Sequence, residues 1–149
     1  MAWSRILLVL VLFSCQTPKV DLSFQPSEAL DVMQDQLGAW NRGDIDGFME
    51  GYWKSDSLQF VTSRGLRQGW EQVRQGYHKS YPTVEKMGHL TFDYERVEWA
   101  DDRQEMLYIL GRWRVKESND PLDSGHSGWF HLTFKGFQDG PRIVADHTW

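Results

Sequence analysis

Apolar residues in the first half of the chain recur every three or four positions, which is the spacing of one face of a helix. The first such row runs from Leu30 to Trp40. Gly43 follows it and suits the left-handed position after a helix end. Asp44 is placed to cap a second, short helix. The pattern therefore predicts two helices joined by a tight turn.

A third helix is predicted at residues 69–81, where Trp70 and Tyr77 lie on one side and Pro82 ends the pattern. Before it, residues 58–62 are typical of a short strand, and a turn follows at residues 63–65.

From residue 90 onward the periodicity changes from helical to alternating. It predicts four strands separated by two hairpin turns and one polar connection: strands 90–100, 104–116, 128–137 and 142–149, turns 101–102 and 138–140, connection 117–126. Helices that precede a set of long strands indicate an α+β fold, with the helices on one face of a curved antiparallel sheet. A parallel sheet would need helices between its strands.

The first residues have the pattern of a targeting segment. Eight unbroken apolar residues at 6–13 are too few to span a bilayer, which takes roughly 20 residues, but they fit a secretory signal. The run Leu12-Phe13-Ser14-Cys15 resembles the bacterial lipobox, which implies a lipoprotein-type signal peptide at 1–14, lipidation of Cys15 and a tether at 15–26. Ordinary secretion, or a buried strand with a free thiol, is the alternative. Residues 27–149 are then one domain.

The charge is mildly acidic. The formal net charge is −5, and removal of residues 1–14 takes away only Arg5, which gives −6. Nucleic-acid-binding proteins usually carry a basic stripe, and this sequence has none, so no nucleic-acid partner is predicted.

Aromatic residues are unusually frequent: eight Trp, eight Phe and five Tyr in 149 residues. Each ring buries about 150–250 Å², so a small core fills quickly. The surplus is expected on the surface, around a cavity or in an interface.

Several segments together resemble the nuclear transport factor 2-like superfamily and its SnoaL-like branch. These are residues 40–48, 64–65, 69–73, 77, 81–82 and 142–148, in the same order as in that family. The resemblance implies a cone-shaped sheet covered by three N-terminal helices, an internal cavity and often a homodimer. It does not imply one activity, because members include isomerases, dehydratases, hydrolases, cyclases and protein-binding modules. Gly140-Pro141 and Trp149 depart from the family pattern, so the rim of the pocket is expected to differ.

Asp146 and His147 are the candidate catalytic residues, because each can exchange a proton. Neighbours on a strand point to opposite faces, so the two cannot form a dyad. Strict alternation groups His147 with Ile143 and Ala145, which favours an enclosed position for the histidine; a hydrogen-bonded structural histidine is the alternative. Asp146 shares its predicted face with Thr148.

A set of large polar-tipped side chains is predicted to line the pocket and orient a ligand. For any single member, ordinary core packing is the alternative, and His131 is equally compatible with the outer face. The set is Trp40, Tyr52, Trp53, Tyr77, Tyr81, Trp113 and His131.

No metal site or cofactor is predicted. The five histidines lack the spacing of metal-binding motifs, there is no cysteine pair, and no glycine-rich phosphate loop or nucleophile elbow is present.

Three functions remain open. The first is an exported, lipid-anchored domain that binds a small, partly apolar molecule. The second is an acid–base enzyme (isomerase, dehydratase or hydrolase) that uses His147 or Asp146. The third is a homodimeric protein-interaction module. A base with a shifted pKa and a hydrogen-bonding partner inside an open cavity would favour the enzyme. An open cavity without such a pair would favour binding alone, and a filled cavity would favour the interaction module.

Overall fold

The computed structural model describes residues 22–116 and 125–149. The predicted signal peptide, the lipidation at Cys15 and most of the connection at 117–126 lie outside the described residues. Within them, no helix is long and apolar enough to cross a membrane.

The helices follow the apolar rows of the sequence. The first two, α1 (Pro26–Asn41) and α2 (Ile45–Met49), are joined by a turn in which Gly43 has φ 82°, and the Asp44 side chain caps α2 by accepting a hydrogen bond from the Gly47 amide. The third helix, α3 (Trp70–Ser80), is followed by the single turn α4 (Val84–Met87), which was not predicted. The three predicted helices are confirmed.

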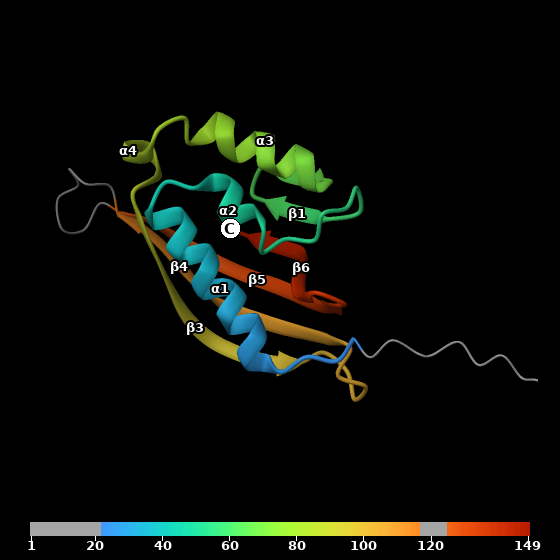
Figure 1. The fold of residues 1–149 in the computed structure, drawn as a ribbon. Helices are drawn as coiled ribbons and strands as arrows, with labels where there is room; N and C mark the ends of the chain where they lie inside the picture. Colours follow the sequence, from blue (N-terminus) through green and yellow to red (C-terminus); the bar gives the residue numbers. More distant parts are fainter. Residues whose placement is uncertain (1–21, 117–124) are drawn as a thin grey trace, which may run out of the picture.

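The sheet has six strands in the order β2-β1-β6-β5-β4-β3. Their bounds are β1 (Gln59–Thr62), β2 (Gly65–Gln68), β3 (His89–Trp99), β4 (Met106–Lys116), β5 (His126–Phe137) and β6 (Gly140–Thr148). Figure 1 shows α1 crossing one face of the curved sheet, with α2 and α3 near the end where β1 and β6 meet. The α+β class and the curved sheet under N-terminal helices are confirmed.

Two features of the sheet differ from the prediction. β2 was not predicted, because all four of its residues are exposed and give no buried pattern. The sheet is also mixed, since β1 pairs with β6 in parallel and every other pair is antiparallel. In the sequence, α3 and all the other strands lie between β1 and β6, so local patterns do not reveal that these two strands pair.

A β-bulge in β6 changes which residues face the helices. Thr133 of β5 pairs with Ala145, but the next residue, Phe134, pairs with Ile143, so Val144 is an extra residue without a partner on β5. Ile143 and Asp146 are consequently buried on the same side, three positions apart instead of two.

The core lies between the helices and the concave face of the sheet. Leu107, Ile109 and Val115 of β4 are buried there, as the alternation predicted. Phe24, which the sequence placed in the tether, is only 4% exposed and packs edge-on against Trp99 with ring centroids 5.0 Å apart. The packed fold therefore begins before residue 27.

Candidate functional site

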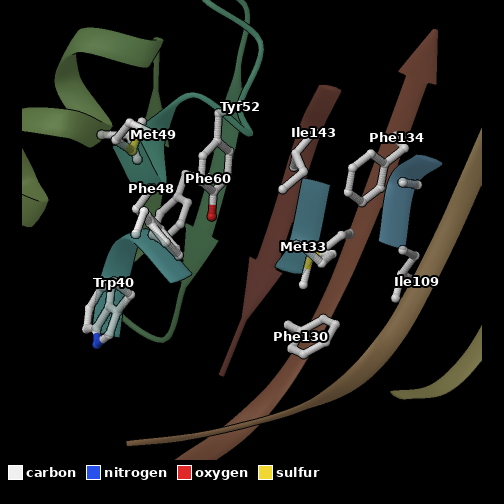
Figure 2. Packing of buried hydrophobic residues seen from close by; sticks show 14 of the residues in the cluster. Met33, Trp40, Phe48, Met49, Tyr52, Phe60, Ile109, Phe130, Phe134 and Ile143 are labelled. Atoms are coloured by element: carbon white, nitrogen blue, oxygen red, sulfur yellow. The ribbon is translucent and has the colours of Figure 1, made fainter. Parts of the chain in front are cut away.

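A cavity of about 290 Å³ lies between the helices and the concave face of the sheet. Its walls are largely aromatic: Trp40, Phe48, Tyr52, Phe60, Tyr77 and Tyr81 on one side, and Phe92, Trp113 and Phe130 on the strands opposite. Figure 2 shows part of this packing, with Trp40, Phe48, Tyr52 and Phe60 facing Met33, Ile143 and Phe130. The space is open and is not filled by its own side chains.

The rings on the helical side support one another in edge-to-face contacts. Phe48 lies 5.2 Å from Trp40 and 5.3 Å from Tyr77, measured between ring centroids, and Tyr77 lies 5.7 Å from Phe60. The Trp40 indole donates a 3.1 Å hydrogen bond to the Met87 carbonyl, which fixes the ring against α4. Such contacts fix ring orientations, so this wall is preformed.

Asp146 is the polar centre of the cavity. It is 3% exposed, the bulge in β6 turns it toward the helices, and both of its oxygens accept hydrogen bonds. Tyr52 Oη donates to Oδ2 at 2.8 Å, and Thr148 Oγ1 donates to Oδ1 at 2.7 Å. Burial raises the pKa of this carboxyl from 3.8 to about 6, while the two hydrogen bonds and the charge of His147 oppose the rise.

Two tyrosines lie close to this carboxyl. Burial first, and the negative charge of Asp146 second, raise the pKa values of Tyr52 and Tyr77 well above their ordinary value. Both hydroxyls therefore keep their protons near neutral pH and can serve as hydrogen-bond donors beside Asp146.

The mouth of the cavity carries two arginines from the β1–β2 hairpin. Arg64 and Arg67 line the cavity and are exposed, as are Ser80 and Trp149, so these residues mark its opening. The guanidinium group of Arg67 lies against Gly76, where any larger side chain would collide with it. Neither arginine was among the predicted site residues, and the local signal was the predicted turn at residues 63–65, which contains Arg64 and precedes Arg67.

Most of the predicted ligand-binding residues do meet at this cavity. Trp40, Tyr52, Tyr77, Tyr81 and Trp113 line it. Trp53 does not: it stacks on Phe137 with ring centroids 5.6 Å apart, beside a separate hollow formed with Glu50 and Arg142.

The two histidines are on the opposite face of the sheet from the cavity. His147 is exposed, so the expectation of an enclosed position is wrong, and the bulge at Val144 is the physical reason. His131 pairs with His147 across the strands and packs on Tyr108 with ring centroids 4.9 Å apart. Burial, and then the charge of His147, lower the pKa of His131. Of the two candidate bases, only Asp146 reaches the cavity.

The arrangement is suited to moving a proton. A carboxyl with a pKa of about 6 is largely ionised at neutral pH, but its pKa is close enough to neutrality for it to accept and return a proton. In the described part of the chain, no group of three or more His, Cys, Asp or Glu side chains is placed to hold a metal ion.

No family model matches the sequence, and no curated protein is similar enough to count as a match. Solved structures do match. An NTF2-like superfamily protein from Salmonella enterica is 14% identical with a TM-score of 0.62, over 83% of this chain and 89% of that one. A ketosteroid isomerase-like protein from Erwinia carotovora atroseptica is 13% identical with a TM-score of 0.61, over 82% and 92%.

A stronger match is an NTF2-like protein of unknown function from Shewanella oneidensis MR-1. It is 30% identical with a TM-score of 0.74, and the match covers 82% of this chain and 96% of that one. None of these matches names the SnoaL-like branch, which stays a prediction. On this identity and coverage, the chain belongs to the nuclear transport factor 2-like superfamily.

Proposed function

We propose that the protein is an acid–base enzyme that acts on a small, partly apolar molecule, with Asp146 as the proton acceptor and donor. The observation that supports this most is a buried carboxyl whose pKa is raised to about 6 and which borders open, aromatic-lined space. Tyr52 holds the carboxyl in place by its hydrogen bond, so it is a positioning residue. His147 has no part in this proposal.

The size and lining of the cavity support a small substrate. Ligand pockets usually span about 300–1,000 Å³, and this cavity, at about 290 Å³, is at the lower end of that range. A single carboxyl that removes a proton from one atom and returns it to another is sufficient for an isomerisation. Among the three classes considered, the isomerase therefore needs the fewest additional groups.

A second candidate is binding without catalysis. Both oxygens of Asp146 already accept hydrogen bonds from Tyr52 and Thr148, which reduces their capacity to take a proton from a ligand. In that case the carboxyl would only orient a ligand that donates a hydrogen bond.

Proton exchange on a small cyclic ketone separates the two candidates. We suggest 2-tetralone deuterated beside its carbonyl, with the loss of deuterium followed by NMR. The enzyme proposal requires exchange above the buffer rate, with a rate that rises with pH through about 6 as Asp146 ionises. Asp146→Asn should abolish the exchange and keep the binding. Binding by the natural chain without exchange would leave only the second candidate.

A matched pair of bulky variants tests whether the cavity is the site. Leu132→Trp adds bulk to the cavity wall, whereas Leu110→Trp adds the same bulk to the other face of the sheet. Leu132→Trp should lose the binding of 2-tetralone, whereas Leu110→Trp should keep it. Undiminished binding by a folded Leu132→Trp variant would place the site elsewhere.

We also propose that the chain is exported, anchored by lipid at Cys15, and homodimeric. The apolar run at 6–13 and the lipobox-like Leu12–Cys15 sequence support the first two statements. The third rests on the family to which the chain belongs.

A further inference from the structure

The mouth and the floor of the cavity carry different kinds of polar groups. Arg64 and Arg67 are at the mouth, whereas the carboxyl of Asp146 is buried deeper among the aromatic rings. Between the two ends, the walls are mainly aromatic and aliphatic. A molecule that fills this space is therefore held in a defined direction.

The two arginines at the mouth are unpaired. Six of the nine described arginines form ion pairs with carboxylates, but neither Arg64 nor Arg67 pairs with any described residue. Two unpaired positive charges beside one cavity also contrast with the acidic net charge of the chain. An unpaired pair of guanidinium groups beside a pocket has its full hydrogen-bonding capacity available to an anion.

The guanidinium groups of Arg64 and Arg67 lie close enough to the cavity for their charges to act on residues that line it. The positive charge of Arg67 lowers the pKa of Tyr77, and that of Arg64 lowers the pKa of Tyr81, although burial has the larger, opposite effect on both tyrosines. Gly76 on α3 leaves the space that the Arg67 head group occupies. Both charges thus act on rings that line the opening.

An anion is not expected at the deep end. At neutral pH the Asp146 carboxyl is largely ionised, and a second negative charge beside it in a buried site would be strongly disfavoured. The negative group of a ligand is therefore favoured at the mouth of the cavity, and its uncharged end is favoured at the deep end.

We propose that the pocket selects amphipathic monocarboxylates, whose carboxylate lies at the mouth between Arg64 and Arg67 and whose apolar body enters the cavity. This inference rests on the proposed function only because both use the same cavity, and it names the substrate class of that site. A planar carboxylate suits the guanidinium fork, which can donate two parallel hydrogen bonds.

The test compares octanoate with 1-octanol, which has the same apolar body without the charge. Binding is followed by fluorescence of the cavity tryptophans Trp40 and Trp113 at low ionic strength. We expect octanoate to bind about tenfold more tightly than 1-octanol, the ratio that corresponds to a charge-assisted hydrogen bond. Raising the salt concentration should reduce this ratio, because the mouth is exposed to solvent.

Two double variants and one matched control complete the test. R64Q/R67Q should remove the preference for octanoate while 1-octanol binds as before, and R64E/R67E should shift the preference to octylamine. Arg103 is an exposed and unpaired arginine in the β3–β4 turn, so Arg103→Gln should leave the preference for octanoate unchanged.

The possible failures are distinguishable. If 1-octanol binds as tightly as octanoate, or if R64Q/R67Q keeps the preference, the selection by charge is wrong and the proposed enzyme is untouched. If neither compound binds to the natural chain, the inference is wrong, and the exchange test with 2-tetralone still decides the proposed function separately.

Discussion

The hydroxyl of Tyr52 donates a 2.8 Å hydrogen bond to Asp146, a residue 94 positions further along the chain. The bond joins the segment after α2 to the last strand of the sheet, and it is buried at both ends. Burial raises the pKa of Asp146, and this bond is one of the interactions that limit the rise. The pair therefore couples the stability of the fold to the protonation of the candidate site.

Replacing Asp146 by Asn should change how stability depends on pH. The carboxyl has a pKa of about 6 in the folded chain and 3.8 in the ordinary case, so between these values the folded state binds more protons than the unfolded state. The free energy of unfolding of the natural chain should consequently fall as pH rises through this window, by about 3 kcal/mol from this group. Asn has no such dependence.

Urea unfolding of both chains at pH 4 and pH 7 measures this effect. The stability of the Asn variant relative to the natural chain should increase by about 2 kcal/mol between the two pH values, because at pH 4 the unfolded carboxyl is already partly ionised. If the two chains differ in stability by the same amount at pH 4 and at pH 7, Asp146 does not titrate in this range.

Tyr52→Phe should raise the pKa of Asp146 further, because the hydroxyl stabilises the ionised carboxylate. At pH 7 we expect a loss of about 1–3 kcal/mol in the free energy of unfolding, since a buried acceptor loses its donor. Carbon-13 NMR of the carboxyl would report the pKa directly. Tyr81→Phe is the control, because Tyr81 lines the same cavity without bonding to Asp146; an equal pKa shift in both variants would contradict the assigned role of Tyr52.

Phe24→Ala should destabilise the fold by about 3 kcal/mol, the usual cost of removing a buried aromatic ring. Leu22→Ala is a suitable control two positions earlier, because Leu22 is 41% exposed. Thermal unfolding of the two variants compares them. Similar small losses would mean that the segment before α1 is dispensable, as the sequence pattern suggested.

Cys15→Ala should release the protein from the membrane fraction if the cysteine carries the lipid anchor. Fractionation of cells that express the full chain, followed by immunoblotting, measures the distribution. Leu12→Ile, which keeps the apolar character of the segment, is the control and should stay in the membrane fraction. Continued membrane association of the Ala variant would refute the proposed anchor.

The helices and long strands were predictable because each has a local period. Leu30 to Trp40 marks α1 through spacing alone, and Leu107 to Val115 marks the buried face of β4 in the same way. The turns at 101–102 and 138–140 were also visible locally, as polar residues between alternating segments.

The site could be predicted only in part, because its geometry depends on a shift of register. The aromatic wall followed from composition and from the family resemblance. The choice between Asp146 and His147 did not, because it depends on the extra residue Val144, and a bulge leaves no reliable mark in a sequence of alternating residues. The arginines at the mouth were equally hidden, since β2 has no buried residue to reveal it as a strand.

The parallel pairing of β1 with β6 also constrains the order of folding. Gln59, Phe60 and Val61 find their partners in residues 145–147, and the Trp53 amide donates to the Ile143 carbonyl. During synthesis the first helices emerge long before these partners exist, and contacts so distant in sequence form slowly. The chain can therefore complete its hydrophobic interior only after β6 has left the ribosome, because until then β1 and the segment at Trp53 lack their partners.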